Sequence, residues 1–113
     1  MREITSHKKF GHDRQPEVLA SEARVISGAP DNYMIVYSAG GHVHIPFVTM
    51  GHPGVTNEAL LAIVIDRLEG FQTGEFACTE NAAALDHARI CLGELEARTR
   101  ARIARGVENT PEV

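Results

Sequence analysis

The first half of the chain alternates short apolar runs with clusters of turn residues. Residues 33–37 and 42–48 are rich in β-branched and aromatic side chains and flank Gly40-Gly41, a pattern that predicts a β-hairpin. Because proline cannot donate a backbone hydrogen bond, Pro46 places the second strand at a sheet edge or marks a bulge.

Two weaker strand patterns precede this hairpin, at residues 4–7 and 17–26. Together with the hairpin they predict that residues 1–53 form a small antiparallel β-sheet.

The periodicity changes after residue 55, where apolar residues begin to recur at steps of three and four. That spacing defines one face of a helix. Thr56 is the expected N-cap, Glu58 lies in the first turn, and Gly70 and Gly74 are expected to end the helix. The predicted apolar stripe consists of Leu60, Ile63, Val64, Leu68 and Phe71.

A second helix is expected to begin at Thr79 or Asn81 and to run to Gly106. A short link around residues 72–75 joins the two helices, which is typical of an antiparallel helical hairpin over residues 54–113. The predicted apolar stripe of the second helix consists of Leu85, Ala88, Leu92, Leu95 and Ile103.

The expected fold class is therefore α+β, a small antiparallel sheet followed by a long helical hairpin within one compact domain. The second helix spans roughly 26 residues, about 39 Å, against roughly 16 residues for the first. The chain has 113 residues, of which 43% are hydrophobic and only 5% aromatic, so its core is thin. We expect the uncovered apolar stripe to pack on the sheet or on another copy, and therefore predict a homo-oligomer.

Charge and composition exclude several classes of partner. The formal net charge is −4, concentrated in residues 15–97, whereas residues 1–14 and 98–113 are basic. This distribution argues against binding to long nucleic acids but suits one small anion. The sequence has no apolar run long enough for a membrane span and no signal-peptide pattern. We therefore expect a cytoplasmic protein, with Cys78 and Cys91 reduced.

The most specific cluster is Arg98, Arg102 and Arg105, which follow one another at i, i+4 and i+7. On a helix these positions share one face beside the apolar stripe, and guanidinium groups bind phosphate through parallel hydrogen bonds. Two ordinary explanations remain open: arginines near a helix C-terminus favour the helix dipole, and Glu94 can pair with Arg98.

Phe71 and Asn81 lie on either side of the interhelical link. An aromatic ring can stack on a purine and an amide can read its edge, so this pair fits a base-binding site. The alternatives are that Phe71 belongs to the core and that Asn81 caps the second helix.

Three histidines offer a metal-binding alternative. His42 and His44 share one face of a predicted strand, and His52 follows in the next loop, but no carboxylate or cysteine stands at a ligand spacing. Two histidines on an exposed strand explain the pattern without a metal. The chain also has no nucleophile, phosphate-loop or dinucleotide motif, so we expect neither catalysis nor a resident cofactor.

From Gly54 onward the sequence resembles the helical-hairpin domain shared by phage anti-CBASS and Thoeris anti-defence proteins. The resemblance rests on residues 54–68, Gly70-Phe71-Gln72, the Cys78 and Asn81 region, and the run of arginines that ends in Gly106-Val107-Glu108. Residues 3–8 also resemble the start of the longer, sheet-bearing Thoeris anti-defence members. One departure is Glu75, which stands where the family has proline.

The resemblance implies a viral sponge, which binds cyclic nucleotide immune messengers without cleaving them. The messengers of the family include cyclic ADP-ribose isomers and cyclic di- or trinucleotides, and its members are dimers or hexamers built through the hairpin. Carried onto this sequence, the ADP-ribose pocket falls on Phe71, which stacks on adenine, Asn81, which hydrogen-bonds the ligand, and Arg98 and Arg102, which hold the diphosphate. Arg105 is a weaker third arginine.

Two other functions stay open at this level. The arginine face could bind an acidic protein or nucleic acid as a small regulatory module, and the histidine strand could serve a metal-dependent hydrolase.

Overall fold

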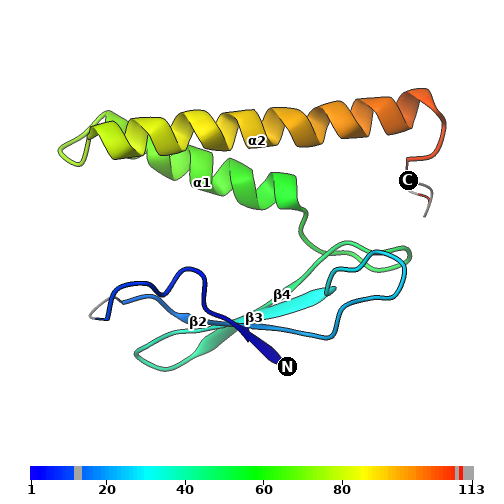
Figure 1. Ribbon diagram of the computed structural model, residues 1–113, viewed down its shortest axis with the longest axis horizontal. Helices are drawn as coiled ribbons and strands as arrows, with labels where there is room; N and C mark the ends of the chain where they lie inside the picture. Colours follow the sequence, from blue (N-terminus) through cyan, green and yellow to red (C-terminus); the bar gives the residue numbers. More distant parts are fainter. Residues whose placement is uncertain (12–13, 109, 111–113) are drawn as a thin grey trace. The chain divides into compact units, whose positions relative to one another are not determined.

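The computed structural model describes residues 1–11, 14–108 and 110 of the chain. It divides into two compact units, Met1–Val55 and Thr56–Val113. The first unit is an antiparallel sheet and the second a pair of helices, which confirms the predicted α+β class (Figure 1).

The sheet contains four strands that pair in the order in which they follow along the chain. They are β1 (Arg2–Ile4), β2 (Glu17–Ala20), β3 (Asn32–Val36) and β4 (His42–Pro46), and all pairings are antiparallel. Pro46 ends β4, which is an edge strand, as the sequence predicts.

The predicted hairpin is formed by β3 and β4. Its turn is closed by Tyr37, whose backbone N–H donates to Gly41 O at 2.9 Å, and it uses positive φ angles of 97° and 90° at Gly40 and Gly41. Residues with a side chain rarely adopt such angles, so the two glycines are required by the turn.

The weaker strand predictions are partly wrong. The pattern over residues 17–26 is a strand only as far as Ala20, because the chain then turns back at a bridge between Ala23 and Pro30. An ion pair between Arg24 and Asp31, 3.0 Å long, lies beside this bridge. The first strand lies at Arg2–Ile4, slightly before the expected segment.

The strand register gives the sheet one apolar and one mixed face. Partners across the strands share a face, and successive residues alternate. One face is apolar apart from Arg2 and carries Ile4, Val18, Ala20, Tyr33, Ile35, Val43 and Ile45, and the other carries Glu3, Glu17, Leu19, Asn32, Met34, Val36, His42, His44 and Pro46. Ala20 is fully buried, and the Tyr33 and Phe47 rings meet edge to face at 5.4 Å.

The second unit is an antiparallel hairpin of α1 (Asn57–Gln72) and α2 (Thr79–Ala104). The predicted N-cap is confirmed, since Thr56 Oγ1 accepts a hydrogen bond from Ala59 N at 3.0 Å. The helix continues through Gly70 to Gln72, and Thr73 caps it. Over residues 1–11, 14–108 and 110, no helix is long and apolar enough to cross a membrane.

The two helices meet along a seam of alternating three- and four-residue steps, the spacing of a coiled coil. The seam is marked by side chains that are less exposed than their neighbours. On α1 these are Glu58, Leu61, Ile65, Leu68 and Gln72, and on α2 they are Asn81, Leu85, Ala88, Leu92, Leu95, Thr99 and Arg102. Ile65 and Leu85 are buried at its centre.

The seam corrects part of the predicted stripes. On α1 it uses Leu61 and Ile65, whereas the predicted Ile63 and Val64 are 59% and 46% exposed. Helix α1 is apolar around more than one face, and the face that α2 covers is the one that keeps the alternating spacing.

On α2, Leu85, Ala88, Leu92 and Leu95 lie on the seam as predicted, but Ile103 does not. Ile103 is 61% exposed, and Arg102 takes the seam position beside it.

We predict that Ile65→Ala destabilises the hairpin by about 2–4 kcal/mol, because truncation of a buried isoleucine loses apolar burial and leaves a cavity. The matched control is Ile63→Ala on the exposed face of α1, which should cost far less. Urea unfolding followed by helical circular dichroism measures both, and equal losses would show that the seam lies elsewhere.

Candidate ligand-binding site

The tip of the hairpin is braced by two amide side chains, one from each helix. Gln72 Oε1 accepts a hydrogen bond from Cys78 N at 3.1 Å, and Asn81 Nδ2 donates one to Phe76 O at 3.0 Å. The loop between α1 and α2 is therefore tied to the last residue of α1 and the first turn of α2.

Asn81 is not the N-cap of α2. That position belongs to Cys78, whose Sγ accepts from Asn81 N at 3.4 Å. The capping alternative considered from the sequence is thus wrong, and the side chain of Asn81 is instead directed to the loop.

Two aromatic rings and a guanidinium group gather at the tip. The Phe71 and Phe76 rings meet edge to face with centroids 5.9 Å apart, and the guanidinium carbon of Arg67 lies 5.3 Å from the Phe71 centroid. Phe71 is half-buried, so it is neither a full core residue nor an open platform.

Neither Phe76 nor Arg67 is among the ligand residues predicted from the sequence, although Phe76 belongs to the segment before Asn81 that carries the family resemblance. A signal for Phe76 existed, since it is an apolar aromatic residue placed in a polar link after Gly74. We call Arg67, Phe71, Phe76 and Asn81 the tip cluster.

The opposite end of α2 carries the arginines, and one of them is buried. Arg102 is 5% exposed; its Nε donates to Glu108 Oε1 at 3.2 Å, and its Nη2 donates to Val107 O and Thr110 O, each at 2.8 Å. We call Val107, Glu108 and Thr110 the strap. The strap turns back after Gly106, whose φ is +74°, and Val107 N donates to Arg102 O at 3.0 Å.

The strap explains how a charged residue can occupy the seam. Helix α2 has 26 residues and α1 has 16, so the last turns of α2 extend past the start of α1. Arg102 lies in this stretch, and a buried guanidinium needs acceptors for its N–H groups. The strap supplies a carboxylate and two carbonyl groups.

Arg98 and Arg105 are exposed, unlike Arg102. The Glu94–Arg98 ion pair considered from the sequence is not formed, since Glu94 takes part in none of the ion pairs found among the described residues. Arg105 provides the C-cap of α2, with its backbone N–H donating to Ala101 O at 3.1 Å.

One chain does not bring all the predicted ligand residues together. Phe71 and Asn81 both contact Phe76 at the tip, but Arg98 lies 17 residues beyond Asn81 on the same helix, about 26 Å away at ~1.5 Å per residue. The tip cluster and the arginines therefore lie far apart within one hairpin, and we call them the two candidate half-sites.

Residues 45–100 match the Acb2/Tad1 hairpin domain. The helical hairpin of this chain belongs to that family. The match covers α1 and most of α2, including Phe71, Asn81 and Arg98, while Arg102 and Arg105 follow it in the sequence.

A curated relative supports the assignment of the Acb2/Tad1 hairpin. Thoeris anti-defense 1 of Bacillus phage SBSphiJ7 is 48% identical to this chain over 67 residues, which are 59% of this chain and 47% of the phage protein. The match thus spans about half the length of that relative.

His42, His44 and His52, the histidines considered as metal ligands, lie in the sheet unit. His44 Nε2 is 3.0 Å from Asn32 Oδ1, and His42 and His44 share the mixed face of β4. Over residues 1–11, 14–108 and 110, no three histidine, cysteine or acidic side chains are grouped to hold a metal ion.

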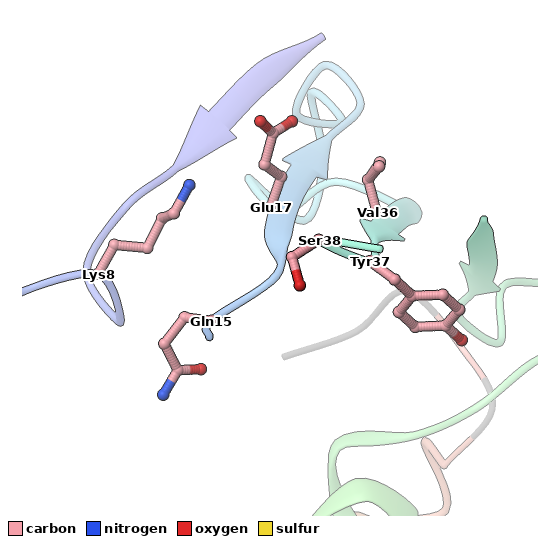
Figure 2. A pocket seen from close by; sticks show the side chains of 6 residues that line it. All are labelled: Lys8, Gln15, Glu17, Val36, Tyr37 and Ser38. Atoms are coloured by element: carbon pink, nitrogen blue, oxygen red, sulfur yellow. The ribbon is translucent and has the colours of Figure 1, made fainter. Parts of the chain in front are cut away.

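The sheet unit also has a polar hollow of about 230 Å³, lined by Lys8, Gln15, Glu17, Val36, Tyr37 and Ser38 (Figure 2). Its walls come from β2, from the segment before it and from the end of β3. None of the predicted ligand residues lines it.

We predict that Arg102→Ala lowers the stability of the Acb2/Tad1 hairpin by about 1.5–3 kcal/mol, because it removes hydrogen bonds from a charged donor, including the ion pair with Glu108. Arg98→Ala, an exposed arginine one turn earlier, should change stability by no more than ~0.5 kcal/mol. Thermal unfolding of the two variants checks this prediction. An Arg102→Ala variant with unchanged stability would contradict the stabilising contact between Arg102 and the strap.

Proposed function

We propose that this chain is a viral anti-defence sponge that binds cyclic nucleotide immune messengers and withholds them without cleavage. The observation that carries this proposal is the Acb2/Tad1 hairpin together with its 48% identity to a protein called Thoeris anti-defense 1. The proposed ligands are cyclic ADP-ribose isomers, with cyclic di- or trinucleotides as a second class. The proposed place of action is the cytoplasm of the infected bacterium.

The proposed site uses both ends of the hairpin. Phe71 stacks on the adenine and Asn81 hydrogen-bonds the ligand, while Arg98 and Arg102 hold the diphosphate and Arg105 adds a third positive charge. Aromatic stacking and guanidinium–phosphate hydrogen bonds are the two interactions that a nucleotide offers most strongly.

Because the two half-sites are about 26 Å apart on one helix, the proposed pocket needs two copies of the chain. Two hairpins placed antiparallel bring the tip cluster of one beside the arginines of the other. The exposed apolar residues Ile63, Val64 and Ile90 support such an assembly, because they leave uncovered surface on both helices. The proposed oligomer is a dimer or a hexamer.

The rival function, an arginine face for an acidic protein or a nucleic acid, is weakened by the strap. A surface that binds a polyanion needs its guanidinium groups exposed, and the side chain of Arg102 is buried.

Arg102 can donate two parallel hydrogen bonds to a phosphate only if it first releases part of the strap. A guanidinium group presents two edges of paired N–H donors, and Nη2 contributes a proton to each. Nη2 already donates to both Val107 O and Thr110 O. The proposed diphosphate must therefore displace at least one of these carbonyl groups, and it also meets the negative charge of Glu108.

We predict that the purified chain binds a cyclic ADP-ribose isomer and returns it intact after denaturation. Arg98→Ala should weaken this binding about 10- to 100-fold, because a charge-assisted hydrogen bond is worth ~1.5–3 kcal/mol. Arg100→Ala, also exposed on α2, is the matched control and should bind normally.

Calorimetry measures these affinities, and mass spectrometry of the released ligand tests its integrity. Recovery of a hydrolysed product would point to an enzyme, and absence of binding across a panel of cyclic nucleotides would contradict the sponge.

We further predict that Glu108→Gln tightens diphosphate binding about fivefold, since an amide holds Arg102 less strongly than a carboxylate by ~1 kcal/mol. Glu96→Gln removes the same charge from an exposed position on α2 and serves as the control. Weaker binding by Glu108→Gln, with Glu96→Gln unchanged, would mean that the strap positions Arg102 for the ligand instead of competing with it.

A further inference from the structure

Phe76 offers more open aromatic surface at the hairpin tip than Phe71. Its side chain is 73% exposed, whereas Phe71 is half-buried and in contact with both Arg67 and the ring of Phe76. A planar ligand that reaches the tip therefore meets Phe76 before it has full access to Phe71.

The backbone of Phe76 is fixed from both sides of the loop. Its carbonyl accepts from Asn81 Nδ2 at 3.0 Å, and two residues later Cys78 N donates to Gln72 Oε1 at 3.1 Å. Within the loop, Ala77 N donates to Gly74 O at 3.3 Å. The hydrogen-bonded loop thus keeps the exposed ring in place. An aromatic group that is ordered in advance loses little conformational freedom when it binds a ligand.

Resting on the proposed function, we propose that Phe76 makes a second, edge-to-face stacking contact with the base that stacks on Phe71, and that Asn81 is the positioning residue that holds Phe76. The two rings meet at an interplanar angle of 71°, so a base that stacks on one ring presents its edge to the other. Arg67 adds a positive charge beside the rings, while the carboxylate of neighbouring Glu75 disfavours phosphate. The tip therefore takes the base, and the phosphate groups lie toward the arginines of the other copy.

The role of Asn81 follows from its existing hydrogen bond. Its Nδ2 donates to Phe76 O, so removing the amide frees the loop backbone that carries the ring. On this account Asn81 supports Phe76 in addition to its proposed hydrogen bond to the ligand, so part of its effect on affinity disappears once the ring has been removed.

The first test measures the affinity of the full chain for a cyclic ADP-ribose isomer. Because an edge-to-face aromatic contact is worth ~0.5–1.5 kcal/mol, Phe76→Ala should weaken binding about 2- to 12-fold, while Phe76→Tyr should bind normally. The matched control is Phe10→Ala, which removes a ring that is 72% exposed in the other unit.

The outcomes separate this inference from the proposed function. A wild-type chain that binds no cyclic nucleotide contradicts the sponge itself. A wild-type chain that binds, with Phe76→Ala equally tight, contradicts only the stacking role. A Phe76→Ala chain that changes its oligomeric state in native mass spectrometry, and loses affinity for that reason, overturns the stacking role in favour of an interface.

A second readout reports on the ring directly. The chain contains no tryptophan, so Phe76→Trp introduces a unique fluorophore at the tip. Its emission should be quenched as the cyclic ADP-ribose isomer binds, and that of Phe10→Trp should not change. Unchanged Phe76→Trp emission at saturating ligand would contradict stacking at this position.

A double-mutant cycle tests Asn81. Asn81→Ala alone should weaken binding, and in the Phe76→Ala background it should cause a smaller further loss, because residues that act partly as a unit are not additive. Fully additive losses would mean that Asn81 does not act through Phe76.

Discussion

The seam between α1 and α2 is the interaction on which the rest of the hairpin depends. Its alternating three- and four-residue spacing aligns two helices of unequal length, 16 and 26 residues, and so determines what happens at each end. At the tip, the first turn of α2 lies beside the end of α1 and the two amides can brace the loop. At the other end, α2 extends past the start of α1. The strap covers the last turns of α2, which α1 does not reach.

This geometry separates the chemistry of the hairpin into two half-sites. Stacking groups gather where the helices join, and guanidinium groups gather where α2 continues alone. A nucleotide also has two chemical ends, a flat base and an anionic phosphate group, so under the proposed function the two half-sites match one ligand only when two chains meet. The net charge of −4 fits a small anion, since a long polyanion would meet the acidic residues of both helices.

Much of this fold could be predicted from the sequence, because local rules decide it. The glycine turn between β3 and β4, the Thr56 cap and the extent of α2 all follow from residue types at fixed spacing. The face of α1 could not be predicted in the same way. Several of its faces are apolar, and only the pairing with α2 selects Leu61 and Ile65 over Ile63 and Val64.

The same limit applies to the candidate site. The spacing of Arg98, Arg102 and Arg105 places them on one face of α2, but it does not reveal that Arg102 lies on the seam or that the chain turns back to cover it. That burial depends on the difference in helix length and on three residues beyond the helix. Phe76 likewise stands out only once the hydrogen bonds of the loop are known.

The central claim is that one ligand site is built from the tip of one hairpin and the arginines of another. It is tested most directly by mixing two variants that bind weakly, Phe71→Ala and Arg98→Ala, unfolding and refolding them together, and measuring the affinity for a cyclic ADP-ribose isomer. The account predicts that the mixture regains part of the binding that each variant lacks alone, because a mixed assembly contains one intact tip beside one intact arginine end. A mixed assembly that forms and still binds no more tightly than either variant alone would contradict a shared site.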